Sequence, residues 1–203
     1  LDGRVKSLHP RIHGGILARR DRAEDLKDLD AFDIKPIDFV IVNLYPFTFK
    51  VKDIEEAKNP EHESLVEFID IGGPTMIRAA AKNCEFVVPI SDPADYPLIL
   101  DELKTNGSVS QATRRRLAAK VFAMMSAYDA AIARYFSLDE KVLESDGLPK
   151  KLAPVEPLVL CLSQSLRYGE NPHQQAGLYR KLEIGAEQTK GLWTQLQGKE
   201  MSY

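Results

Sequence analysis

The sequence predicts an α/β fold built on a parallel sheet, and the alternation of apolar runs with helical segments carries this prediction. Residues 38–42 (DFVIV) and 86–90 (FVVPI) are short, continuous apolar runs, which are typical of buried parallel strands. An Ala-rich helical run, residues 76–83, separates them, and a second helical segment, 93–107, follows and ends at Asn-Gly. Strands that alternate with helices in this way indicate an α/β domain.

Residues 110–136 form the longest periodic segment and predict a long helix. Its apolar side chains recur at steps of three and four and form one stripe, made of Leu117, Val121, Met124, Tyr128, Ile132 and Tyr135. We expect this stripe to pack against other elements. The arginine triplet 114–116 is expected to form a solvated face or a subunit contact.

The composition of residues 144–157, which include three prolines, indicates a linker. The LVLCLS run that follows predicts a new buried strand. We therefore expect a first domain over 1–145, a linker over 146–157 and the beginning of a second domain over 158–203.

The composition is that of a globular protein, with 44% hydrophobic residues, 28% charged residues and a formal net charge of −3. This balance argues against a general nucleic-acid binder, and no apolar run approaches the length of a membrane span. Cys84 and Cys161 lack metal-ligand spacing, so we expect two buried, reduced thiols and a cytosolic protein. The chain begins without Met and stops without a closing helix, and we expect a fragment truncated at both ends.

Residues 2–20 form a basic stretch that also contains three glycines. Its arginine and lysine side chains suit a phosphate or carboxylate ligand, and a solvated basic loop is the alternative. His9 and His13 have the spacing of a helical metal pair. Pro10 between them argues against a helix and therefore against such a pair.

Polar residues follow the first predicted strand, at the point where ligands gather in open parallel sheets. Asn43 and Tyr45 are aimed at such a crevice if 38–42 is a strand, although a Tyr-Pro-Phe turn also suits core packing.

The stretch 70–83 (DIGGPTMIRAAAKN) joins an acid and a Gly-Gly-Pro turn to a helix. Gly72 and Gly73 allow close backbone approach, and free N–H groups at a helix start hold anions or polarised oxygens. Lys82 ends the run, and its own chemistry favours a lysine that complements the helix dipole over a residue that transfers protons. Residues 165–174 (SLRYGENPHQ) form a fourth group, dense in polar, aromatic and turn residues just past a predicted strand.

These four stretches, with the closing LQGKEMSY, resemble in sequence order the PurH family of bifunctional purine-biosynthesis enzymes, across essentially the whole chain. The resemblance implies a methylglyoxal-synthase-like first domain with IMP cyclohydrolase activity, here without its N-terminal part. It also implies the start of a cytidine-deaminase-like AICAR formyltransferase domain. The Lys-His motif of formyl transfer and the folate site belong to the part that this chain lacks, so we expect no formyl transfer from it.

The resemblance also assigns roles to individual residues. It implies nucleotide contacts from three segments of the first domain and one of the second: Arg4, Val5, Lys6 and Ser7; Val42 and Asn43; Asp70, Ile71, Gly72 and Gly73; and Arg167, Tyr168 and His173. Ser7 stands where the family commonly has Thr and keeps the hydroxyl. The implied catalytic residues are Lys82, Lys6, Tyr45 and Asp70.

Cyclisation joins the carboxamide nitrogen of FAICAR to its formyl carbon and then loses water to give IMP. We hypothesise that Asp70 orients or deprotonates the carboxamide, and that Lys82 transfers a proton. The Gly-Gly amides with Lys6 or Tyr45 are assigned the oxyanion, and Arg4 the ribose phosphate.

We expect no metal or cofactor for cyclisation, and 10-formyltetrahydrofolate as co-substrate of formyl transfer. The family implies a homodimer, and no nucleic-acid or membrane partner is expected. A non-catalytic phosphate-sensing module and a dimerisation piece are the competing interpretations.

Overall fold

The computed structural model describes residues 6–44, 47, 66–137, 155–181 and 197–198. By its contacts the chain divides into two compact units, Leu1–Met125 and Ser126–Tyr203, which are described separately. The division falls within a long helix, α7 (Gln111–Ser137), and the predicted linker lies mostly outside the described residues. The predicted domain boundaries therefore stay predictions.

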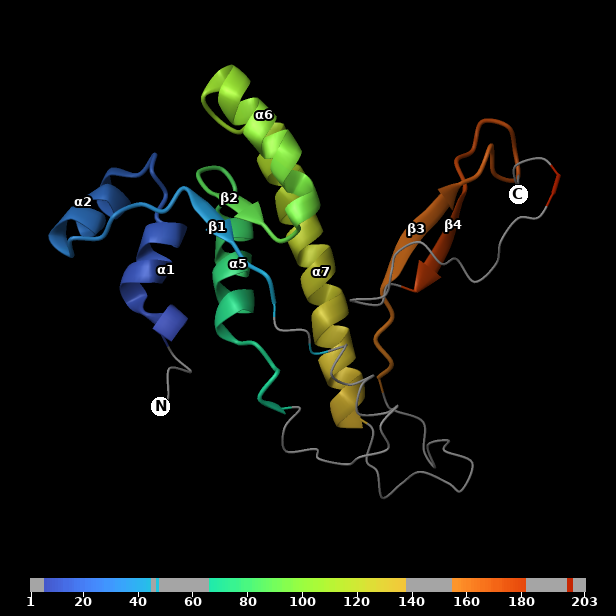
Figure 1. Ribbon diagram of the computed structural model, residues 1–203, viewed down its shortest axis with the longest axis horizontal. Helices are drawn as coiled ribbons and strands as arrows, with labels where there is room; N and C mark the ends of the chain where they lie inside the picture. The colour runs from blue at the N-terminus through green and yellow to red at the C-terminus, as the bar shows by residue number, and fades with distance from the viewer. Residues whose placement is uncertain (1–5, 45–46, 48–65, 138–154, 182–196, 199–203) are drawn as a thin grey trace. The chain divides into compact units, whose positions relative to one another are not determined.

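A parallel pair of strands lies at the centre of the first unit (Figure 1). Strand β1 (Phe39–Ile41) pairs with β2 (Val88–Ile90), with Phe39 opposite Val88 and Ile41 opposite Ile90. Helix α5 (Gly72–Lys82) comes between them in sequence and packs against both strands. The two predicted strands and the helix between them are confirmed. A parallel pair of strands needs a crossover connection, and this helix is part of it.

The sequence predicted that both strands are buried, and the structure confirms this for β2 but not for β1. All three residues of β2 are buried, whereas in β1 only Val40 is buried, with Phe39 38% and Ile41 57% exposed. Apolar runs mark fully buried strands only where helices cover both faces of a sheet. On the open face, β1 and helix α6 line an apolar groove of about 430 Å³, formed by Phe39, Ile41, Ile90, Tyr96, Ile99, Leu100 and Leu103.

The basic N-terminal stretch forms the short 3₁₀ helix η1 (Lys6–Leu8) and helix α1 (Pro10–Leu17), followed by α2 (Ala23–Ala31). The expectation that Pro10 prevents a helix was wrong, because Pro10 is its first residue, where a missing N–H costs nothing. His9 is the N-cap, and its Nδ1 accepts a hydrogen bond of 3.1 Å from the Arg11 backbone N–H. His9 therefore starts this helix instead of pairing with His13 on it.

The segment after β2 begins with the 3₁₀ helix η2 (Pro93–Asp95) and continues as α6 (Tyr96–Asn106). The predicted stop is confirmed: Gly107 has a φ of 70° and donates its N–H to the Leu103 carbonyl at 3.0 Å. A left-handed residue after the last turn is the ordinary way for glycine to end a helix.

Helix α7 (Gln111–Ser137) confirms the predicted long helix. Leu117, Val121 and Tyr128 of the predicted stripe are buried, but Met125 rather than Met124 fills the position between Val121 and Tyr128. Leu117 joins the apolar core of the first unit, whose other buried members are Val88, Ile90, Ile99 and Val109.

The arginine triplet at the start of α7 is only partly a surface feature. Arg114 donates from Nε to the Cys84 carbonyl at 2.8 Å and from a terminal nitrogen to the Val109 carbonyl at 3.0 Å. Arg116 donates to Asp95 at 3.0 Å, and Arg115 is exposed. Two of the three arginines thus hold the start of α7 against other residues of the first unit.

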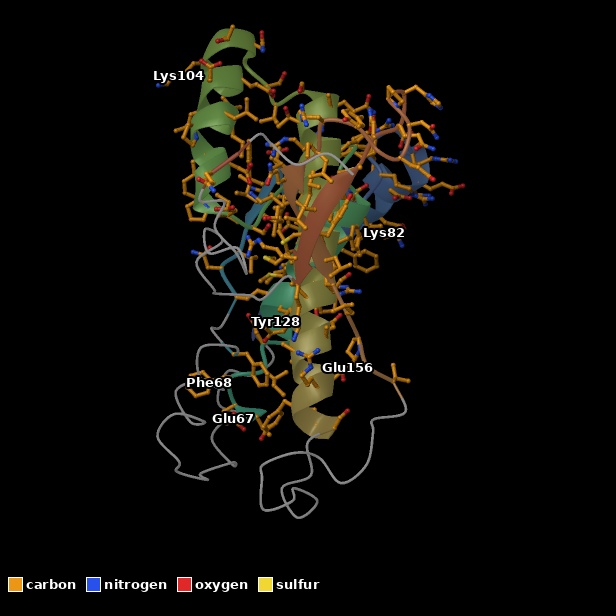
Figure 2. The ribbon with its side chains drawn as sticks, turned by 90° about the vertical axis from the view of Figure 1, so that its right-hand side faces the viewer. Glu67, Phe68, Lys82, Lys104, Tyr128 and Glu156 are labelled. Atoms are coloured by element: carbon orange, nitrogen blue, oxygen red, sulfur yellow. The ribbon has the colours of Figure 1, made fainter. Side chains whose placement is uncertain are left out.

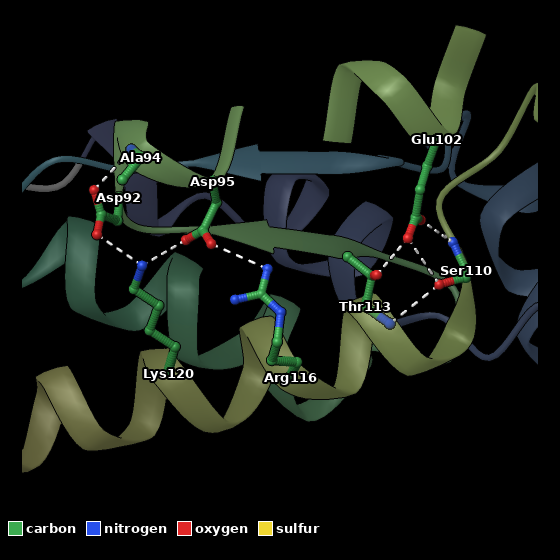
Figure 3. A network of polar contacts seen from close by, with 8 residues as sticks. All are labelled: Asp92, Ala94, Asp95, Glu102, Ser110, Thr113, Arg116 and Lys120. Atoms are coloured by element: carbon green, nitrogen blue, oxygen red, sulfur yellow. Dashed lines mark hydrogen bonds and ion pairs between the residues drawn. The ribbon is translucent and has the colours of Figure 1, made fainter. Parts of the chain in front are cut away.

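Glu102 of α6 fastens the first turn of α7 (Figure 3). Its carboxylate accepts from the Thr113 hydroxyl at 2.5 Å and from the Ser110 backbone N–H at 2.6 Å. The hydrogen bond from Thr113, followed by that from Ser110, lowers the pKa of Glu102 below its ordinary value. The carboxylate form is therefore the one that the folded chain favours.

This lowered pKa predicts a contribution to stability that depends on pH. Because the unfolded state binds the proton more readily, the stabilisation is present above the ordinary pKa of glutamate and is lost as pH falls through the folded value. We expect Glu102→Gln to lower the urea midpoint at pH 7 and to flatten the fall in stability at acidic pH. Urea titrations at pH 7, 5, 4 and 3 test this. Wild-type and variant midpoints that fall in parallel would contradict it.

The second unit contains an antiparallel hairpin of β3 (Leu160–Ser165) and β4 (Gly177–Lys181). The strand predicted from LVLCLS is present, but Leu160 and Leu162 are each 52% exposed, so the prediction of a buried strand was wrong. Cys84 and Cys161 are free and half-buried, less buried than expected. Among the described helices, none is long and apolar enough to span a membrane.

Candidate functional site

The turn before α5 is built around the Asp70 carboxylate. Asp70 Oδ1 accepts a hydrogen bond of 2.9 Å from the Gly73 backbone N–H. One turn later, the Thr75 N–H donates to the Ile71 carbonyl at 3.1 Å, so the helix is under way from Ile71. An acidic side chain at a helix start satisfies an otherwise unpaired N–H and complements the helix dipole.

Gly72 and Gly73 are required by space, since two other segments approach them closely. A Cβ at Gly72 would lie 1.9 Å from Ser7 Oγ. A Cβ at Gly73 would lie 2.4 Å from Asp70 Oδ2 and 3.1 Å from Val42 Cγ1. Both values for the nearest atoms are below any ordinary contact, so a side chain at either position forces a neighbour to move.

Three of the four segments predicted to contact a nucleotide therefore meet at one point. Ser7 comes from η1, Val42 from the end of β1, and Asp70 with the two glycines from the start of α5. Val42 is buried, and Asn43 beside it is exposed. The point lies beyond the carboxyl end of a parallel strand, where ligands bind in open α/β sheets.

Lys82 does not lie at this point. Helix α5 spans eleven residues from Gly72 to Lys82, which at 1.5 Å per residue separates its ends by about 15 Å. Figure 2 shows Lys82 well above Glu67 and Phe68, which precede the helix. The Lys82 side chain is exposed in the last turn, where a lysine also complements the helix dipole.

The remaining predicted residues are placed as follows. Arg4, Val5 and Tyr45 lie outside the described residues, and of Lys6 only the backbone, in η1, is described. Ile71 is the N-cap residue of α5 and is 59% exposed. The Gly73 N–H, which the sequence analysis assigned to the oxyanion, donates to Asp70 in this structure, and its role as an oxyanion donor stays a prediction.

Three arginines of the basic stretch are held by aspartates of the same unit. Arg19 pairs with Asp25 at 2.8 Å and Arg20 with Asp38 at 2.5 Å. The hydrogen bond from the Arg19 side chain is the main reason that the pKa of Asp25 falls to about 2. Arg11 binds Asp33 and the Phe32 carbonyl in the same way. For these three arginines the structure favours a structural surface role over an anion site.

Asn83, which the sequence did not single out, ties α5 to the end of α1. Its side chain is buried, and Nδ2 donates to the Ile16 carbonyl at 2.7 Å and the Ala18 carbonyl at 3.0 Å. Both carbonyls lie at the end of α1, where a helix has no partners of its own for its last carbonyls. This one side-chain amide therefore joins the end of α5 to the end of α1.

In the second unit, the predicted polar stretch 165–174 starts at the last residue of β3 and continues into the loop that leads to β4. The Gly169 N–H donates to the Gln174 carbonyl, and the Gln174 N–H donates to the Asn171 carbonyl, each at 2.9 Å. The Arg167 guanidinium lies 5.7 Å from the centre of the Tyr168 ring. Arg167, Tyr168 and His173 are exposed on this loop. Within the described parts of both units, no three His, Cys, Asp or Glu side chains group as a metal site.

The fold places the first unit among α/β proteins with a small parallel sheet, a class in which ligands bind beyond the carboxyl ends of the strands. A sequence model of the AICARFT/IMPCHase bienzyme family matches residues 80–203. The bifunctional purine biosynthesis protein PurH of Clostridium acetobutylicum is 50% identical over 203 residues, which is 100% of this chain and 37% of that protein. PurH of Halalkalibacterium halodurans is 49% identical over the same shares.

One solved structure is also similar to this chain. The crystal structure of ForH is 38% identical, with a TM-score of 0.57, over 67% of this chain and 69% of that one. The chain belongs to the AICARFT/IMPCHase bienzyme family and spans 37% of the length of the PurH relatives described above.

Proposed function

We propose that the first unit carries part of the nucleotide site of an IMP cyclohydrolase, within a bifunctional protein of purine biosynthesis. The observation that supports this most is the meeting of Ser7, Val42 and Asp70 at Gly72–Gly73. Three separate segments that a nucleotide is predicted to contact reach one point beyond β1. A phosphate-sensing module would share the basic stretch, but it has no need of Asp70, Tyr45 and Lys82 together.

In this proposal the chemistry is proton transfer and orientation. Asp70 receives or orients the carboxamide N–H of FAICAR as its nitrogen attacks the formyl carbon. Because the Gly73 N–H is engaged by Asp70, we assign the developing oxyanion to Lys6 or Tyr45. Arg4 holds the ribose phosphate and Ser7 Oγ contributes a hydroxyl contact. Water then leaves to give IMP, and no residue of the described turn suggests a metal or cofactor in these steps.

The role proposed for Lys82 does not depend on the turn at Asp70. The family resemblance assigns it proton transfer, yet it lies at the opposite end of α5 from Asp70. Residues outside the described turn must therefore complete any site that contains it. Turnover of FAICAR by a full-length relative with the equivalent lysine changed to alanine decides whether that role stands.

We propose the domain assignment on the basis of the family resemblance. Residues 1–145 form most of a methylglyoxal-synthase-like cyclohydrolase domain and 146–157 the linker. Residues 158–203 open a cytidine-deaminase-like formyltransferase domain, in which Arg167, Tyr168 and His173 contact AICAR. The formyl donor is 10-formyltetrahydrofolate, and the full-length protein is a cytosolic homodimer.

Nucleotide binding by this chain tests the proposal. We expect calorimetry to detect IMP binding, and Asp70→Asn to weaken it at least tenfold, about 1.4 kcal/mol. The new amide oxygen still accepts from the Gly73 N–H, so the variant removes charge and keeps the turn.

Asp101→Asn is the matched control, because Asp101 is an exposed carboxylate on α6. Equal affinities for the wild type and Asp70→Asn would remove Asp70 from the site. No heat of binding at millimolar IMP would overturn the proposed site in this chain. Binding without turnover in a full-length relative would favour the phosphate-sensing alternative.

A further inference from the structure

A lysine of α7 holds the segment that leaves the carboxyl end of β2 (Figure 3). Lys120 Nζ lies 2.7 Å from Asp92 Oδ2 and 2.7 Å from Asp95 Oδ2. Asp95 Oδ1 also accepts from Arg116 at 3.0 Å, and the Asp95 side chain is only 8% exposed. Asp92 Oδ1 accepts from the Ala94 N–H at 2.9 Å and so starts η2.

The network is electrostatically matched, with two carboxylates and two cations. Hydrogen bonding from Lys120 is the main reason that the pKa of Asp92 is lowered. Partial burial lowers the pKa of Lys120, but the hydrogen bonds to Asp92 and Asp95 outweigh it and raise the pKa above its ordinary value. Removing Lys120 therefore leaves Asp92 without its ion-pair partner and Asp95 with Arg116 alone.

This network lies next to the candidate site through one backbone hydrogen bond. The Val42 N–H donates to the Ile90 carbonyl at 3.0 Å, and Asp92 is two residues beyond Ile90. Val42 Cγ1 is in turn the side-chain neighbour of Gly73. Lys120 is thus connected to the site through Asp92, the chain back to Ile90, and Val42, all within the first unit.

A tie between α6 and α7 offers a comparison. Glu102 of α6 accepts a hydrogen bond from Thr113, which lies seven residues before Lys120 and about 10 Å nearer the start of α7. If Lys120 only held α7 against the segment that follows β2, the two ties would be equivalent. Only the Lys120 tie reaches Asp92 and Asp95, which directly follow β2.

We propose that Lys120 is a positioning residue for the nucleotide site. By holding Asp92 and Asp95 it fixes the carboxyl end of β2, and through Ile90 it fixes Val42 as the wall beside Gly73. The part of the proposal that concerns ligand affinity rests on the proposed function. The part that concerns the position of Val42 does not.

Amide hydrogen exchange tests the structural part without a ligand. We expect Lys120→Met to speed exchange of the Val42 N–H, relative to that of Ala80 in α5, by roughly tenfold. Thr113→Val removes the Thr113 hydrogen bond from the tie between α6 and α7 and leaves the hydrogen bonds from Ser110. It should change both amides by the same factor. Lys120→Arg restores a cation and should restore the wild-type ratio. A Val42-to-Ala80 ratio that is unchanged in Lys120→Met, or changed equally in Thr113→Val, would overturn the proposal.

Calorimetry with IMP tests the functional part at a temperature where each variant is folded. We expect Lys120→Met to weaken IMP about five- to tenfold and Thr113→Val to leave affinity within twofold. Lys104→Met, at an exposed lysine of α6, controls for the loss of a positive charge. If the wild type binds no IMP while the exchange ratio shifts as expected, the proposed function fails and the positioning of Val42 stands. If IMP binds but Lys120→Met binds equally well, the functional part of the inference is overturned.

Discussion

Gly72→Ala is expected to abolish most nucleotide binding while leaving the chain folded. The added methyl would lie 1.9 Å from Ser7 Oγ and 3.2 Å from Ser7 Cβ, so the Ser7 hydroxyl must leave its place beside the turn, by rotation of the side chain or by movement of η1. A displacement of about 1 Å at a positioned site costs on the order of a hundredfold in function. In a helix interior alanine is a better helix former than glycine by about 1 kcal/mol, and at Gly72, the first residue of α5, the same preference acts in part. Affinity for IMP should therefore fall while the urea midpoint stays level or rises.

A second variant separates the two consequences of this change. Ser7→Gly removes both atoms that the new methyl would meet. Combined with Gly72→Ala, it should return η1 to its place and recover part of the affinity, short by the contribution of the Ser7 hydroxyl. Calorimetry on the two single variants and the double variant measures this coupling. Wild-type affinity in Gly72→Ala would show that the contact of Ser7 with the turn is unimportant for the ligand.

Asn83→Asp is expected to be the most destabilising single change proposed for this chain. It replaces the amide that donates to the Ile16 and Ala18 carbonyls with a carboxylate of the same shape. Two carbonyl oxygens then face a buried negative charge without a partner, which costs about 3–5 kcal/mol. Urea unfolding at pH 7 should show a loss of this size.

The same variant should recover in acid. Burial beside two carbonyls raises the pKa of the new carboxyl in the folded state above its unfolded value of about 3.9. The deficit in stability is therefore smallest below that value, where a protonated carboxyl donates one hydrogen bond, and grows as pH rises through the folded pKa. Asn106→Asp, at an exposed residue of α6, provides the control. A variant as stable as the wild type at pH 7 would contradict the role given to Asn83.

Local pattern accounts for the part of the site that the sequence predicted. Asp70 and Gly73 are three residues apart, and their hydrogen bond is a feature of one helix start. The position of Val42 at the end of a strand is visible in an apolar run, whereas its role as a nucleotide contact came from the family resemblance. The approach of Ser7 to Gly72 followed from the family resemblance alone, since nothing in the local pattern brings η1 to α5.

The residues that were missed depend on contacts between distant segments. Asn83 and Ile16 are 67 positions apart, and Lys120 and Asp92 are 28 apart. An asparagine at a helix end and a lysine on a helix face are ordinary in sequence. Only the packing of α1 on α5, and of α7 near η2, gives them partners. The exposure of β1 was missed for a related reason, because a run such as DFVIV does not reveal how many helices cover the sheet.

The open face of β1 also affects how the chain behaves at different concentrations. Phe39, Ile41 and Leu100 are 38%, 57% and 52% exposed and line one apolar groove with little polar surface. Exposed apolar patches and strand edges favour self-association. When molecules associate in the folded state alone, the apparent unfolding midpoint rises with protein concentration. We therefore expect the apparent unfolding midpoint of this chain to rise with protein concentration, which urea titrations at several concentrations would measure.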